Sequence, residues 1–96
     1  MEVVIRKSTR PDKRLQARYA NKTVHFGAQG GSTFIDHGDP KLKENWEARH
    51  RVRENWQDYS SAGALSKHLL WNKPTLQASI RDLNARQKIY QFVLGR

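Results

Sequence analysis

The sequence predicts an α+β domain, in which a small N-terminal antiparallel sheet of three or four short strands is followed by three helices packed on it. Two observations lead to this fold class. Up to residue 36, short runs rich in β-branched and aromatic residues alternate with turn residues. After residue 38, apolar residues recur at helical spacing. With 96 residues, the chain is expected to form a single domain spanning 1–96.

The strands are expected within residues 1–36. Residues 3–5 form a short apolar run that is typical of a strand. Residues 15–19 alternate apolar and polar side chains, and 23–26 follow after a short turn, a spacing that favours an antiparallel hairpin. A glycine-rich stretch then interrupts the pattern, and residues 33–35 are expected to add a last short strand.

Helices are expected over residues 39–54, 61–71 and 74–94. Asp39-Pro40 is a typical helix start, because aspartate accepts backbone N–H bonds as a cap and proline suits the first helical position. The end of the last helix is apolar on nearly all sides, so something must cover it. The sequence leaves two covers open, which are the protein's own core and a docking partner.

The composition excludes several classes of protein. The chain has no cysteine, which rules out a disulfide framework and thiolate chemistry. No apolar run approaches the roughly 18 residues that a membrane span needs, and the N-terminus lacks the apolar region of a signal peptide. We therefore expect a soluble protein that is intracellular or packaged inside a particle.

The net charge of +9 favours a polyanionic partner such as nucleic acid. This charge is uneven along the chain. Residues 1–24 and 61–96 each carry a net charge of +5, whereas residues 25–60 carry −1. The excess positive charge therefore sits at the two ends of the sequence.

Basic residues from both ends are the candidate nucleic-acid-binding residues. They are Arg6, Lys7, Arg10, Lys13, Arg14, Arg18, Lys22, Lys73, Arg81 and Lys88. The N-terminal strip among them could contact about six phosphates, which predicts a steep salt dependence of binding. The sequence signatures of base-specific reading are absent. We therefore expect binding that ignores base sequence and that involves DNA more than RNA.

A central cluster of aromatic and charged residues is expected to join the helices as a structural latch. Its members are Trp46, Arg49, His50, Arg53, Glu54, Trp56 and Trp71. Arg49, Arg51 and Arg53 alternate by two residues, so on a helix they point to different faces. Some are expected to form ion pairs or to stack on tryptophan. Contacts of this cluster with phosphate or with a protein partner are the alternative.

Catalytic and metal-binding motifs are weak. His37, followed by a helix that carries Asn45 and His50, loosely matches a histidine-centred one-metal nuclease, whereas the more ordinary expectation is that His50 packs beside Trp46. The glycine-rich residues 27–31 are expected to form a turn, because a phosphate-binding loop needs a helix directly after it. We therefore expect a protein that is not an enzyme and that has no catalytic residues, metal site or cofactor.

Several segments together resemble a family of small, basic, uncharacterised proteins encoded by large DNA viruses and by some phages. The segments are 5–13, 22–28, 49–50, 53–56, 62–63, 65–66, 70–75 and 78–82, so that the resemblance spans roughly residues 3–83. It implies a viral origin and a setting in the host-cell cytoplasm or nucleus, or in the virion. It carries no catalytic residue over to this chain.

Three functions are therefore expected from the sequence, in decreasing order. The first is non-enzymatic, sequence-nonspecific nucleic-acid binding by phosphate neutralisation, in genome compaction or packaging. The second is a small virion structural or accessory protein that binds acidic capsid or host protein surfaces and associates through Ile89, Phe92 and Val93. The third is a metal-dependent nuclease.

Overall fold

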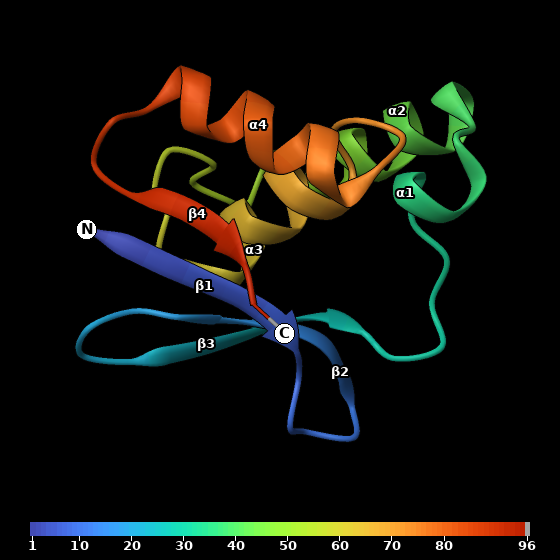
Figure 1. Ribbon diagram of the computed structural model, residues 1–96. Helices are drawn as coiled ribbons and strands as arrows, with labels where there is room; N and C mark the ends of the chain where they lie inside the picture. The colour runs from blue at the N-terminus through green and yellow to red at the C-terminus, as the bar shows by residue number, and fades with distance from the viewer. Residues whose placement is uncertain (96) are drawn as a thin grey trace.

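The computed structural model describes residues 1–95, which form the α+β fold that the sequence predicts. The elements in chain order are β1 (Glu2–Lys7), β2 (Lys13–Arg18), β3 (Thr23–Ala28), α1 (Phe34–His37), α2 (Pro40–His50), α3 (Ala62–Leu65), the π-helical turn η1 (Ser66–Leu70), α4 (Leu76–Arg86) and β4 (Gln91–Leu94). Figure 1 shows the strands in one layer and the helices on one side of it. The opposite face of the sheet carries no helix of the described residues.

The sheet is mixed, with strand order β3-β2-β1-β4, whereas the sequence predicts an antiparallel one. β1 pairs with β2 and β2 with β3 in antiparallel fashion, but β4 pairs with β1 in parallel, with Val3 opposite Phe92. The first strand and the last strand of the described chain therefore lie side by side. β4 itself carries no charged residue, so this pairing adds no charge to the sheet.

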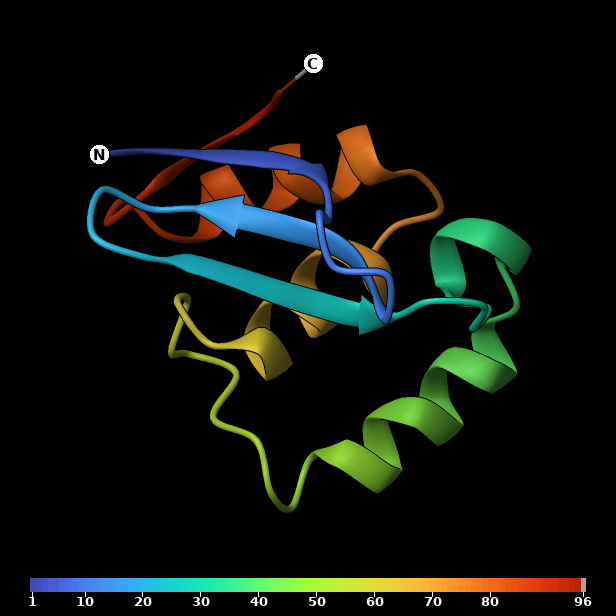
Figure 2. The same ribbon diagram turned by 90° about the horizontal axis from the view of Figure 1, so that it is seen from below.

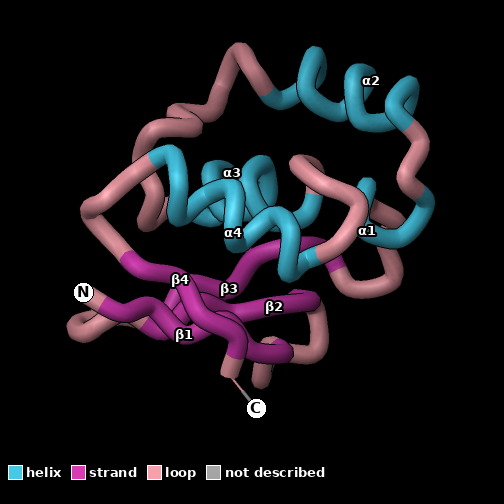
Figure 3. Tube along the Cα trace, turned by 45° about the horizontal axis from the view of Figure 1, so that its top comes forward, coloured by secondary structure: helices cyan, strands magenta, loops and turns pink. Residues whose placement is uncertain are grey.

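The hydrophobic core lies between the sheet and the helices. Alternate residues of the strands face it, among them Val3, Ile5 and Phe26, each at most 1% exposed. From the helical side, Leu69 and Leu83 are fully buried. Figure 3 shows α3 and α4 close above the strands, where these side chains meet. Residues 61–71 accordingly form the helical segment that the sequence predicts, as α3 and η1 together.

The prediction of a strand over residues 33–35 is wrong, because these residues begin α1. Thr33 is the N-cap, and its backbone N–H donates to the Asp36 carboxylate at 2.8 Å. Gly38 ends the helix with φ of 64°, a left-handed conformation that glycine adopts without steric cost. The sequence carries this signal as threonine followed three residues later by an acid, which is a helix-start pattern.

The prediction of a helix over residues 74–94 is also wrong after Arg86, where α4 ends. The Gln87 side chain closes a turn by bonding both the N–H and the carbonyl of Tyr90, at 2.9 and 2.8 Å. The Asn84 side chain likewise bonds the N–H and the carbonyl of Phe92, at 2.8 and 2.9 Å. These two amides reverse the chain and hold β4 in the sheet. The protein's own core therefore covers Phe92, whereas Ile89 and Leu94 of the apolar tail are exposed.

The same finding corrects the expected association surface at the C-terminal tail. Phe92 is 1% exposed and belongs to the core, so it is not accessible to a partner. Val93 is half-buried in β4, and Ile89 is exposed in the turn before it. The three residues do not form one exposed surface.

Helix α2 lies apart from the sheet and ends at His50, short of the predicted residue 54. Figure 2 shows it at the side of the molecule, joined to α3 by the long loop 51–61. As the sequence predicts, Asp39 caps it by accepting the N–H of Lys41, and Pro40 occupies the first turn. Trp46 is the one buried residue within α2, so a single side chain anchors this helix to the core.

Among residues 1–95, no helix combines the length and the apolar character that spanning a bilayer requires.

His68, buried on η1, predicts how stability depends on pH. Its Nε2 lies 2.7 Å from the Trp56 carbonyl oxygen, whereas its Nδ1 is buried without a hydrogen-bond partner among the described residues. Burial lowers the pKa of the imidazole below its ordinary value of 6.5, because a charged ring loses its hydration there. The unfolded chain therefore takes up the proton first, and the unfolding free energy should fall as pH drops below about 6.5.

Urea titrations between about pH 7.5 and 5 check this expectation. His68→Gln keeps a donor to the Trp56 carbonyl and removes the titrating group, so its stability should change less across this range. The other histidines are the same in both proteins. Equal pH dependence of the two proteins would show that His68 is not the group responsible.

Candidate functional site

The first candidate site is the uncovered face of the sheet, called here the open face. Strand register places Val4 beside Arg18 and Arg6 beside Gln16, with His25 next to Gln16 on β3. These residues alternate with the buried ones, so they point away from the helices. The open face is thus defined by Val4, Arg6, Gln16, Arg18, Thr23 and His25, and no helix of residues 1–95 covers it (Figure 1).

Two arginines of the open face are exposed and available to a ligand. Arg6 is exposed on β1, and Arg18 is exposed on β2, where its Nη1 donates to Thr23 Oγ1 at 2.9 Å. No carboxylate within 4.0 Å pairs with either guanidinium among the described residues. No acid of residues 1–95 therefore neutralises their positive charge.

Arg14, also predicted as a nucleic-acid contact, is occupied by an internal ion pair. Its two terminal nitrogens each donate to a carboxylate oxygen of Asp36 at 2.6 Å. The Arg14 guanidinium holds the pKa of the Asp36 carboxyl well below its usual range, and the same pair raises the pKa of Arg14. This bidentate pair ties β2 to α1, so Arg14 acts within the fold.

The other predicted basic residues lie in four different places, one of which is a cleft beside the sheet that Lys13 lines. Arg10 pairs with Asp12 in the exposed turn between β1 and β2, and Lys7 is exposed at the end of β1. Lys22, at the next turn, donates to the Ser60 carbonyl at 3.3 Å. The C-terminal group is exposed in the helical layer and comprises Lys73, Arg81 and Lys88. The structure therefore does not bring all ten residues onto one surface.

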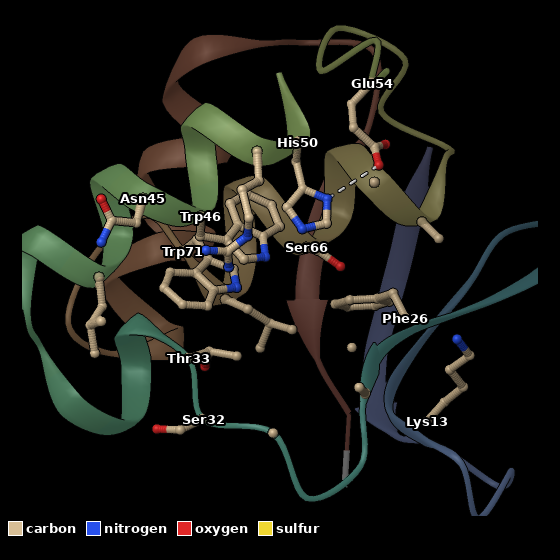
Figure 4. Close-up of a pocket in the computed structure, with 18 of the residues that line it drawn as sticks. Lys13, Phe26, Ser32, Thr33, Asn45, Trp46, His50, Glu54, Ser66 and Trp71 are labelled. Atoms are coloured by element: carbon tan, nitrogen blue, oxygen red, sulfur yellow. Dashed lines mark ion pairs between the residues drawn. The ribbon is translucent and has the colours of Figure 1, made fainter. Parts of the chain in front are cut away.

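The second candidate site is a cleft of about 730 Å³ between α2 and the end of β3. Figure 4 shows Trp46 and His50 on one wall, with Ser32 and Thr33 opposite and Lys13 on the sheet side. The floor includes Leu70 and Trp71, which lie at the end of the π-helical turn. This turn is wider than an α-helical one, since Trp71 N–H bonds Ser66 O, five residues back, at 3.1 Å. Such turns are frequent at functional sites.

An aromatic column runs along one wall of the cleft. Trp46 stacks on Trp71 with ring centroids 5.1 Å apart, and His50 stacks on Trp46 at 4.3 Å, as expected from their spacing of four residues. Trp56 lies nearly parallel to Trp46 at 6.3 Å. The tryptophans are largely buried, whereas the His50 side chain is 41% exposed. The column thus ends in an exposed ring at the cleft.

Glu54 flanks that exposed ring. Its Oε1 lies 3.7 Å from Nδ1 of His50, and its carboxylate packs against the backbone of Gly63 in α3. A β-carbon at position 63 would collide with this carboxylate, so glycine is required for Glu54 to lie where it does. The loop after α2 is held to α3 by this contact.

The aromatic members of the proposed latch therefore contact one another, while its two arginines do not take part. Arg49 is exposed and lines the cleft, and Arg53 is exposed beyond it. Neither forms an ion pair among residues 1–95. The ion pair that does connect α2 to η1 is Glu47 with Lys67, at 2.7 Å. Lys43 adds a bond to the Asn72 carbonyl at 2.9 Å.

The residues considered for a nuclease share the same cleft. His37, Asn45 and His50 all line it. Nδ1 of His37 accepts the N–H of Asp39 at 2.8 Å, and its ring packs edge-on against Trp71. Within the part of the chain that the structure describes, no group of three histidine or acidic side chains is placed to hold a metal ion.

Sequence reasoning missed the cleft and Lys13's place in it. The cleft joins segments that are distant in sequence, and local patterns carry no information on such contacts. The one local hint is the glycine at position 27. Gly27 has φ of 80°, and a β-carbon added there would lie 2.7 Å from Leu70 Cδ1. This glycine lets β3 pass close to η1.

Comparison with known proteins gives one match. No curated protein and no solved structure matches the chain. One family profile, described as a family of unknown function (DUF5754), matches residues 3–50, which is half of the chain and includes β1, β2, β3, α1 and α2. The chain therefore belongs to the DUF5754 family of unknown function.

Proposed function

We propose that this protein binds nucleic acid without enzymatic activity or base specificity, with the phosphate backbone held against the open face of the sheet. One observation supports the proposal above the others. The open face is free of helices and carries two unpaired arginines, Arg6 and Arg18, in the part of the chain that the structure describes. Arginine suits this role because its planar guanidinium donates two parallel bonds to a phosphate.

The charge distribution and the topology agree with this proposal. Segment 1–24, which carries a net charge of +5, forms β1, β2 and the start of β3, whereas β4 carries no charge and the C-terminal residues Lys73, Arg81 and Lys88 lie in the helical layer. A polyanion approaching the sheet therefore meets strands of the N-terminal segment and its positive charge. On the resemblance described above, we further propose a viral origin, with a role in compacting or packaging the genome in the host cell or virion.

Binding of a labelled DNA duplex, followed by fluorescence anisotropy at increasing salt, tests the proposal. We expect micromolar or tighter binding at ~50 mM salt and a steep loss of affinity as salt rises. Arg6→Ala/Arg18→Ala should weaken binding and reduce the slope of log affinity against log salt by about two, since each phosphate contact contributes about 0.9.

The matched control is Lys41→Ala/Arg51→Ala, which removes the same charge from exposed positions on and just after α2. This control should retain nearly all of the slope. Absence of binding at micromolar protein would end the proposal. Equal losses in both double variants would show that net charge, and not the open face, determines binding.

A metal-dependent nuclease is a second candidate, favoured by the placement of His37, Asn45 and His50 in one cleft. It predicts nicking of supercoiled plasmid with Mg²⁺ or Mn²⁺, lost in His37→Ala and His50→Ala proteins. A plasmid that stays intact with the unmodified protein would exclude this candidate.

A further inference from the structure

We propose that the cleft between α2 and β3 binds an unpaired nucleobase together with its phosphate, by extending the aromatic column at His50. The ligand chemistry is a flat heteroaromatic ring attached to a phosphate. It is supplied either by a free mononucleotide or by a single strand of nucleic acid. In the second case the inference rests on the proposed function and defines its substrate class.

The first support is the unfinished column of stacked rings. One face of the His50 ring rests on Trp46, with an interplanar angle of 24°, and its Nδ1 edge faces Glu54. The side chain is nevertheless 41% exposed, so the parts of it that Trp46 and Glu54 do not cover are open to a ligand. A further ring placed there continues the stack, and any base can supply it, since every base has a π-face.

The second support is the chemistry around that ring. Lys13 and Arg49 line the cleft from the sheet side and the helix side, and no carboxylate within 4.0 Å pairs with either among the described residues. Both are placed to neutralise a phosphate. Asn45 and Glu54 also line the cleft, and their side chains can hydrogen-bond the polar edge of a base. The combination of a stacking ring, cations and polar edge groups is that of a nucleotide site.

The third support is size and shape. A cleft of about 730 Å³ lies within the range of roughly 300–1,000 Å³ that is usual for small-ligand sites. Duplex bases are already stacked and paired, so they cannot enter it without unpairing. The cleft therefore favours free nucleotides and single strands over duplex, whereas the open face makes no such distinction.

Tryptophan fluorescence of the full chain provides the test, because Trp46 and Trp71 line the cleft and Trp56 stacks on Trp46. The probes are adenosine monophosphate, a short mixed-sequence single-stranded DNA and the same sequence as duplex. We expect the single strand to quench the emission and the duplex to quench it less.

The variants test the residues of the site. His50→Ala should weaken quenching about tenfold. His50→Phe should restore it, because it keeps a ring to stack on. Lys13→Ala/Arg49→Ala should weaken quenching without removing the stacking ring.

The control is Val52→Ala at an exposed position, which should leave quenching unchanged.

The outcomes with the three probes distinguish the ligand sources. Quenching by the mononucleotide supports the site with a free nucleotide as one source. Quenching by the single strand alone supports it with the polymer as the source. Duplex binding without quenching by either probe overturns the site and leaves the proposed function intact. Quenching by the mononucleotide without binding to any polymer supports the site and ends the proposed function. Equal quenching of His50→Ala and the unmodified protein also overturns the site.

Discussion

Trp46→Ala is expected to lower the free energy of unfolding by about 3–5 kcal/mol, the usual cost of truncating a buried tryptophan. Trp46 is 9% exposed and stacks with both Trp71 and His50. It is also the one buried residue within α2. Its loss should therefore detach α2 as well as open a cavity in the core. Urea unfolding followed by circular dichroism measures the first effect.

Hydrogen exchange of the α2 backbone amides measures the second effect. In the variant, these amides should exchange faster than those of β1 and β2, because α2 loses its one buried side chain and keeps partly exposed contacts such as those of Lys43 and Glu47. Leu42→Ala on the same helix is the control, since Leu42 is 46% exposed and should cost little. Similar costs for the two variants would contradict the anchoring role of Trp46.

Phe92→Ala is expected to have a comparable effect on stability, about 3–5 kcal/mol. Phe92 is 1% exposed and lies opposite Val3 in the parallel pair of β1 and β4. Its backbone is held on both sides by the Asn84 amide. Truncation should leave a large cavity between the sheet and α4 and loosen the last strand.

Ile89→Ala provides the contrast, because Ile89 is 64% exposed and only three residues away. It should change stability by about 0.5 kcal/mol or less. Thermal or urea unfolding of the two variants distinguishes a strand from the helix that the sequence predicts over these residues. Equal costs at positions 89 and 92 would indicate that the segment is not the inward-facing strand described above.

These elements show which parts of the fold could be predicted. The first three strands and the start of α2 follow from local signals, which are alternation, turn residues and the Asp39-Pro40 cap. β4 could not be predicted in this way. Its apolar run is too short to separate helix from strand by periodicity, and its partner β1 lies at the other end of the chain. The pairing depends on the side chains of Asn84 and Gln87, which carry no obvious pattern.

In the candidate site, too, local contacts could be predicted from the sequence and contacts between distant segments could not. Trp46 and His50 are four residues apart, so their stacking on one helix could be predicted. The contributions of Trp71 and Lys13 to the cleft come from distant parts of the chain. The basic composition indicates a polyanion, but only the fold reveals that Arg14 is committed to Asp36, while Arg6 and Arg18 have no carboxylate partner among residues 1–95. Composition gives total charge, and tertiary contacts decide which charges remain available.

The open face as the nucleic-acid surface is tested most directly by NMR chemical-shift mapping of the ¹⁵N-labelled protein, titrated with a short DNA duplex at ~50 mM salt. We predict that the largest amide shifts fall in β1, β2 and β3, centred on Arg6 and Arg18, and that the outer face of α4 around Arg81 changes little. Shifts concentrated on α4, or no shifts at saturating duplex, would contradict binding through the open face.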